Sequence, residues 1–307
     1  MMCSLRGCLE YARQSGRILI PLTDKHDIIG SNFYNFFRLL ERSEIGWISR
    51  LIATPEEITW AMHNYRPPHK RLPADISDTF ISGQPLDSRG APRYIINGIT
   101  SLDGDEWYLH PPSTGKWEEN QFTLSWGHFN KYWPSMLAEL LEEIVFTSEI
   151  QAVISSAVSN AIQDIREPFL AVHFRNTDYK SPFETISNSA LIYCKSSNVK
   201  AIYWASDDMS TIKMAQHFFR QQSINVFNYT LEHDIATIRD AVALHALPTE
   251  YLQSMGISQR DLTIQFLCDV FILSCGREFL GASGTVPFLV NTLRADSKRI
   301  LKIHILR

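Results

Sequence analysis

The chain has 307 residues, of which 45% are apolar and 20% are charged, a length and composition that exclude a peptide, a coiled coil and a disordered chain. Its formal net charge is -4, from 33 acidic and 29 basic side chains. A slightly acidic chain lacks the broad positive field that nucleic-acid binding needs, so no nucleic-acid partner is expected and any anionic partner should be small.

The first part of the chain, up to about residue 134, shows little regular periodicity. A helix is predicted over 5–15 and a strand over 17–21, followed by an aromatic segment over 32–37. A long region rich in Pro, Gly and Trp comes next. It holds six of the seven tryptophans: Trp47, Trp60, Trp107, Trp117, Trp126 and Trp133.

From Pro134 onward, helical and strand patterns alternate. Apolar residues at helical spacing predict helices, and near-continuous apolar runs predict strands that are covered on both faces. The predicted helices cover 148–166, a segment through Ile212, Ala215 and Phe219, 261–275 and 286–294, and the predicted strands cover 169–174, 201–205, 224–227, 279–282 and, as a strand or tail, 300–305. This alternation predicts an α/β fold with a parallel, doubly wound sheet.

The cysteines and apolar segments bear on where the protein resides. Five cysteines, an odd number, show no CxxC pair and no Cys/His metal spacing. Cys268 and Cys275 are predicted to be buried thiols. The N-terminal segment lacks the apolar core of a signal peptide, and the strongest apolar run, 264–275, is interrupted by Asp269. We therefore expect a cytoplasmic protein with no transmembrane segment and no metal site.

The strand predicted over 169–174 ends in residues suited to an anion. In doubly wound sheets, ligands bind beyond the carboxyl ends of the strands. His173 and Arg175 share a face there, and Asp178 follows closely enough to orient the guanidinium. The planar fork of arginine suits a phosphate or diphosphate. The alternative is a surface ion pair between Arg175 and Asp178, with His173 packed in the core.

Two further strand ends carry polar or small residues. Asp208 is typical of a helix N-cap, whereas Asp207 could accept hydrogen bonds from a ligand hydroxyl or from Arg175. The turn over 281–285, of sequence GASGT, lets the backbone approach a ligand closely, and N–H groups at a helix start suit an anion. Beside an Arg-bearing strand end, this turn would complete a diphosphate site that needs no metal.

The segment 171–179, AVHFRNTDY, resembles the HxRxxD segment of the GT-B fucosyltransferase superfamily, which includes the nodulation, α-1,6-, α-1,2- and protein O-fucosyltransferases. Segments 203–208, 269–274 and 278–293 are similar, in order, to the family's strand with an acidic pair, its helix with a donor-binding Asp, and its strand, turn and helix. The resemblance implies two Rossmann-like doubly wound domains facing a cleft. The acceptor-side domain would span 1–147 and the nucleotide-sugar-binding domain 148–307.

The resemblance also implies an activity: inverting, metal-independent transfer of fucose from GDP-fucose to a glycan or another hydroxyl acceptor, without a cofactor. Arg175 would bind the diphosphate and stabilise the departing nucleotide, His173 would contact the nucleotide, and Asp269 would hold the base or the ribose. The remaining donor-binding residues would be Asp207, Ser283, Gly284 and Thr285. Glu184 or Asp178 would be the base that deprotonates the acceptor.

Some features depart from this family or leave alternatives open. Family members usually open with a strand and a Gly-Asn loop, so we expect either that the start is truncated or that the first strand of the N-terminal domain is absent. A second interpretation is a catalytically inactive protein that binds a nucleotide sugar or a glycan. A third is a serine hydrolase using Ser283 with Asp296 and His304, although Thr285 stands where a GxSxG elbow needs glycine. We expect the six early tryptophans to pack in the core. The alternative is that some of them stack on acceptor sugars.

Overall fold

A computed structural model describes residues 17–21, 33–39, 53–56, 58–59, 93–100, 106–108, 144–176, 182–206, 208–229, 253–254, 256–281 and 285–295. The chain divides into two compact units, Met1–Thr147 and Ser148–Arg307. The predicted helix over 5–15 and the predicted strand or tail over 300–305 lie outside the described residues, as do the side chains of the six early tryptophans.

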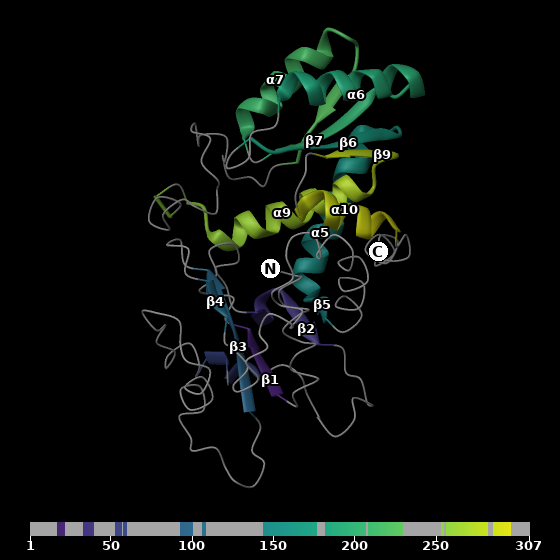
Figure 1. Cartoon of the computed structure of the whole chain (residues 1–307). Coiled ribbons are helices and arrows are strands. Elements are labelled where there is room, and N and C mark those ends of the chain that lie inside the picture. Colours follow the sequence, from purple (N-terminus) through teal and green to yellow (C-terminus); the bar gives the residue numbers. More distant parts are fainter. Residues whose placement is uncertain are drawn as a thin grey trace. The chain divides into compact units, whose positions relative to one another are not determined.

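The second unit contains a parallel sheet with helices on both faces (Figure 1). Its strands are β6 (Phe169–Phe174), β7 (Ala201–Ser206), β8 (Asn225–Phe227) and β9 (Glu278–Gly281), in the order β8-β7-β6-β9. The helices α6 (Phe183–Ser197) and α7 (Met209–Arg220) lie on one face, and α9 (Gln259–Ser274) and α10 (Thr285–Ala295) on the other. The remaining helix, α5 (Ser148–Ile165), packs against α9. The prediction of an α/β fold with a parallel sheet is confirmed.

The helix α6 is the element of this unit that the sequence does not predict. Its sequence, FETISNSALIYCKSS, is rich in Ser, Asn and Thr, which favour turns over helix interiors. A sparse apolar stripe holds it in place, since Ala190 and Cys194 are buried while Ile192 is exposed. Tertiary packing against the sheet therefore supplies the stability that local propensity lacks.

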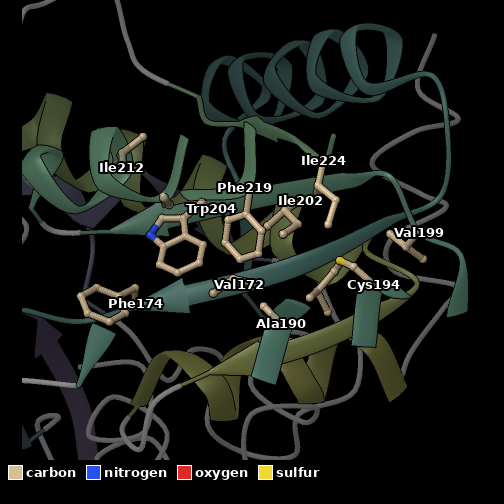
Figure 2. Close-up of a cluster of buried hydrophobic side chains, with 12 residues drawn as sticks. Val172, Phe174, Ala190, Cys194, Val199, Ile202, Trp204, Ile212, Phe219 and Ile224 are labelled. Atoms are coloured by element: carbon tan, nitrogen blue, oxygen red, sulfur yellow. The ribbon is translucent and has the colours of Figure 1, made fainter. Parts of the chain in front are cut away.

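The core of this unit explains how the sheet presents its polar side chains. Val172 and Phe174 of β6 and Trp204 of β7 are buried in one cluster, with Phe219 of α7 covering them (Figure 2). The Trp204 ring centroid lies 5.6 Å from that of Phe174 and 6.0 Å from that of Phe219. Because side chains alternate along a strand, His173 lies on the opposite face of the sheet from this cluster.

The described residues of the first unit form two small sheets. They consist of β1 (Arg17–Pro21) parallel to β3 (Arg93–Thr100), with β4 (Glu106–Tyr108) antiparallel to β3, and of β2 (Phe37–Leu39) antiparallel to β5 (Ile144–Phe146). A 3-10 turn over Phe33–Asn35 precedes β2. Phe33, Phe36 and Phe37 are buried, and the Phe37 ring stacks on Phe146 with centroids 5.5 Å apart. The strand predicted over 17–21 is confirmed.

Candidate functional site

The strand ends that the sequence singles out lie side by side. In the register of the sheet, His173 of β6 is level with Ala205 of β7 on one side and with Gly281 of β9 on the other. All three strands run in the same direction, so their carboxyl ends share one edge. That edge brings together Arg175, the start of α7 and the turn that leads into α10.

The direction of chain winding reverses at this edge, between β6 and β9. From β6 the chain passes to β7 and β8 through α6 and α7, which lie on one face. It then returns through α9, on the other face, and β9 takes the free side of β6. A reversal of this kind separates the loops on its two sides and leaves a crevice beyond the strand ends, which is where open α/β sheets bind ligands.

His173 contributes a buried nitrogen to this edge. The residue as a whole is partly buried, but its Nδ1 atom is fully buried and finds no hydrogen-bond partner in the described part of the chain. Burial, with added repulsion from the Arg175 guanidinium, lowers the pKa of His173 to about 4. The imidazole is therefore neutral at pH 7, and one of its nitrogens can still bond to a ligand.

Arg175 lies one residue beyond β6 and is partly buried. Its charge acts on the His173 imidazole, so the two side chains of the HxR motif lie close together. The next residue, Asn176, anchors the segment, because its Nδ2 donates a hydrogen bond of 2.8 Å to Oδ2 of Asp208. The backbone segment that carries Arg175 is thus tied to the neighbouring strand end.

Asp208 performs the capping role that the sequence predicts. Its Oδ1 accepts a 2.8 Å hydrogen bond from the backbone N–H of Ser210, which makes it the N-cap of α7. Its own N–H donates to the Ser206 hydroxyl, which also lies 2.8 Å from the Thr211 hydroxyl. Asp208 therefore caps a helix with one oxygen and holds the segment after β6 with the other.

The end of β9 packs closely against its neighbours at Gly281. A Cβ atom placed on Gly281 would lie 2.6 Å from the Phe279 ring and 2.9 Å from Cγ of Pro287, so a larger residue would displace the first turn of α10 or the ring. α10 begins at Thr285, and the backbone N–H groups of its first turn have no partners within the helix. They give this edge a positive helix end beside the Arg175 strand.

Asp269 of α9 lies under the sheet and bonds to two residues of its own unit. Its Oδ1 accepts a 2.5 Å hydrogen bond from the hydroxyl of Tyr203, and its Oδ2 accepts one of 3.1 Å from Nε2 of Gln265. Burial raises the pKa of Asp269 to about 6, although both hydrogen bonds oppose the shift. Burial, together with the nearby carboxylate, also raises the pKa of Tyr203.

Most of the other predicted site residues lie outside the residues that the structure describes. Glu184 is exposed in the first turn of α6. Asp178, Asp207, Ser283 and Gly284 lie outside the described residues, and of Thr285 only the backbone is described. Asp296 and His304, of the alternative triad, also lie outside them. The predicted roles of all these side chains stay predictions.

Three residues of this region are not predicted from the sequence. Asn176 carries no signal beyond its place directly after Arg175. Tyr203 does carry one, because a hydroxyl in the middle of an apolar strand needs a buried partner. Gln265 stands four residues before Asp269 on one helix, the spacing at which two side chains meet.

The expectations about cysteines, a metal site and a membrane-spanning helix can be compared with the described residues. Cys268 is buried and Cys275 partly buried, and both are free thiols; the prediction of a buried thiol is confirmed for Cys268. The described residues contain no group of three or more His, Cys, Asp or Glu side chains placed to hold a metal ion. Among the described helices, none has both the length and the apolar character needed to cross a membrane.

Known proteins resemble this chain in structure. No protein-family model matches it, and no curated protein matches it in sequence. The chain is similar to NodZ α-1,6-fucosyltransferase co-crystallised with GDP, with a TM-score of 0.49 and 12% identity over 95% of this chain and 87% of that one. It is also similar to fucosyltransferase NodZ from Bradyrhizobium, with a TM-score of 0.48 and 11% identity over 95% of this chain and 87% of that one. For POFUT1 in complex with GDP, the TM-score is 0.45 and the identity is 13%, over 95% of this chain and 90% of that one.

Proposed function

We propose that the protein is a glycosyltransferase of the fucosyltransferase type, which binds the diphosphate of a nucleotide sugar at the carboxyl edge of the sheet in its second unit. One observation carries the proposal. The register of β6 with β9 places Arg175 and the start of α10 on the two sides of the reversal point. A guanidinium and a helix N-terminus at such a point form a pair of anion-binding groups.

The buried Nδ1 atom of His173, which has no hydrogen-bond partner among the described residues, adds to this support. A buried polar atom without a partner costs free energy, and native proteins keep one where a ligand or water satisfies it. The atom belongs to the strand that carries Arg175, two residues earlier. A neutral imidazole there suits a nucleotide, since it can accept or donate a hydrogen bond without adding charge.

The proposed reaction is a single displacement at the anomeric carbon of the donor sugar. A bond forms from the acceptor hydroxyl oxygen to that carbon, and the bond from the carbon to the diphosphate oxygen breaks with its electron pair. Negative charge grows on the departing diphosphate, where Arg175 and the α10 N–H groups neutralise it. Glu184 or Asp178 takes the proton of the acceptor hydroxyl. The anomeric carbon is inverted, and no step calls for a metal.

The nature of donor and acceptor follows from the motif. The HxRxxD segment at 173–178 resembles that of the GT-B fucosyltransferases, so we propose GDP-fucose as the donor and a glycan hydroxyl as the acceptor. We propose further that the first unit binds the acceptor and that the two units face each other across a cleft, with Asp207, Ser283, Gly284 and Thr285 completing the donor site.

The test measures turnover of GDP-fucose by the wild-type chain and by two arginine variants. Arg175→Ala should lower the rate about 10²- to 10³-fold, because one preorganised donor to the leaving group is lost. Arg220→Ala is the matched control. It removes the same charge from an exposed position at the last residue of α7, far along the helix from the capped end, and should leave the rate unchanged.

The same assay separates the other interpretations. A serine hydrolase would lose activity in Ser283→Ala and would not respond to Arg175→Ala. A catalytically inactive binding protein would bind GDP-fucose without turnover in the presence of any acceptor. Either pattern, with folded variants, contradicts the proposed transferase.

A further inference from the structure

A closed circuit of hydrogen bonds surrounds the main chain of Tyr229. The backbone N–H of Tyr229 donates to the Tyr203 hydroxyl (3.2 Å), and that hydroxyl donates to Oδ1 of Asp269 (2.5 Å). On the other side of the carboxylate, Nε2 of Gln265 donates to Oδ2 (3.1 Å) and also to the carbonyl oxygen of Tyr229 (2.8 Å). Both polar groups of one residue's main chain are thus held by side chains of β7 and α9.

The circuit is built from groups that are mutually satisfied. Tyr203 is 1% exposed, and its hydroxyl both donates and accepts. The amide of Gln265 uses one N–H for each of its two acceptors. In a low-dielectric interior, such a network is strong when complete and costly when one member is lost, so it fixes its parts rigidly. What it fixes is the segment that follows β8.

The clamped residue follows the end of β8, and the Asp269 carboxylate is separated from its main chain by a single hydrogen-bonded side chain on either side. Tyr229 follows β8 by two residues, on the carboxyl side of the sheet. β8 is two strands away from β6, or about 10 Å at the usual strand spacing. Tyr203 is level with Phe227, the last residue of β8, and both oxygens of the Asp269 carboxylate are bonded, one to the Tyr203 hydroxyl and the other to Gln265.

We infer that Asp269 is a positioning residue that acts through Tyr203 and Gln265 to hold Tyr229, and with it the end of β8, as the nucleoside side of the donor site. This inference rests on the proposed function. It departs from the role that the sequence resemblance implies for Asp269, which is direct contact with the base or ribose. In the inferred arrangement, the diphosphate lies at Arg175 and the nucleoside extends across β7 toward Tyr229.

The test breaks each arm of the circuit without touching the ligand. Tyr203→Phe removes the partner of the Tyr229 N–H, and Gln265→Met removes the partner of its carbonyl oxygen. Each variant should weaken GDP binding about tenfold. In the double variant, the affinity for GDP should fall by less than the product of the two single factors, because both side chains hold the same residue, Tyr229. Since no base contact is lost, affinity for UDP should fall by the same factor in any variant that still binds it.

Ser274→Ala is the control. It deletes a buried hydroxyl of α9 that donates to the carbonyl oxygen of Phe271 in its own helix, and should leave GDP affinity unchanged. Hydrogen exchange at the Tyr229 amide supplies a readout without ligand. The amide should be protected in the wild type and in Ser274→Ala, and exchange faster in Tyr203→Phe.

The outcomes separate this inference from the function on which it rests. If Asp269→Asn alone weakens GDP binding while Tyr203→Phe and Gln265→Met bind normally, Asp269 contacts the ligand and the inference is wrong, but the proposed function stands. If the folded wild type binds no nucleoside diphosphate, the proposed function fails and the inference fails with it.

Discussion

Burial of the His173 imidazole makes the stability of the protein depend on pH. Its Nδ1 is buried without a partner among the described residues, and its pKa falls to about 4. Folding therefore demands a neutral imidazole, whereas the unfolded chain takes up a proton near pH 6.5. The contribution of this group to stability is complete above pH 6.5 and is lost as the pH falls toward 4.

This linkage predicts a pH-dependent difference between the wild type and His173→Gln. On lowering the pH from 7 to 4, the free energy of unfolding of the wild type should fall relative to that of the variant, by about 3 kcal/mol at most. Urea titrations followed by circular dichroism at several pH values measure the difference. Asp269, whose pKa is raised from 3.8 to about 6, lowers the stability as the pH rises between these two values, but it is common to both proteins and cancels.

A pH-independent difference would contradict the account of His173. It would mean that the imidazole charges freely in the folded protein, and that its nitrogen is not kept neutral and available for a nucleotide.

Most single-residue roles at this edge follow from residue type and position along the strand. The HxR pair and the cap at Asp208 are visible in the sequence, because strand alternation and capping preferences are local rules. The second bond of Asp208, to Asn176, is not visible, since it depends on the spatial order of β6 and β7. Asp269 shows the same limit, because its partner Tyr203 is 66 residues away.

At the scale of elements, the start of α7 is joined to the end of β6. Asp208 gives one oxygen to the cap and the other to Asn176, the residue after Arg175. Loss of this carboxylate should therefore affect both the stability of the helix and the placement of the guanidinium.

Asp208→Ala should lower the free energy of unfolding by about 1 kcal/mol and should also weaken GDP binding. Ser258→Ala is the comparison variant, because Ser258 caps α9 through a capping box with Asp261 and, in the described part of the chain, has no bond to Arg175 or Asn176. It should cost similar stability and leave GDP affinity intact. Equal affinities for the two variants, measured by calorimetric titration, would show that the Asn176 contact does not position Arg175.

The order of the elements could be read from the sequence in the second unit and hardly at all in the first. From residue 148 on, strands are apolar runs and helices have clear apolar faces, so their succession predicts a parallel sheet. The position of β9 beside β6, which creates the reversal point, has no local signal, since it results from the return of the chain over the other face. In the first unit, β3 and β4 lie in a region whose Pro, Gly and Trp content hides their periodicity, and β5 is only three residues long.

At the scale of the whole molecule, we propose that the donor binds to the unit Ser148–Arg307. Its parallel sheet brings an arginine, a neutral histidine and a helix N-terminus to one edge, although they come from segments more than 100 residues apart in the chain. The protein has a slight negative charge overall, so this edge must attract its anion by local geometry. Binding to the folded unit alone must then raise its stability by mass action.

The most direct test is a thermal-shift measurement of the full chain with GDP, UDP and dTDP, made in parallel on Arg175→Ala and Arg220→Ala. At a GDP concentration about 100 times the Kd, the wild type and Arg220→Ala should gain about 2.7 kcal/mol of stability and melt several degrees higher. Arg175→Ala should melt as a folded protein and show no such gain. An equal rise in Arg175→Ala, or no rise in the wild type with any of the three nucleotides, would contradict the diphosphate site.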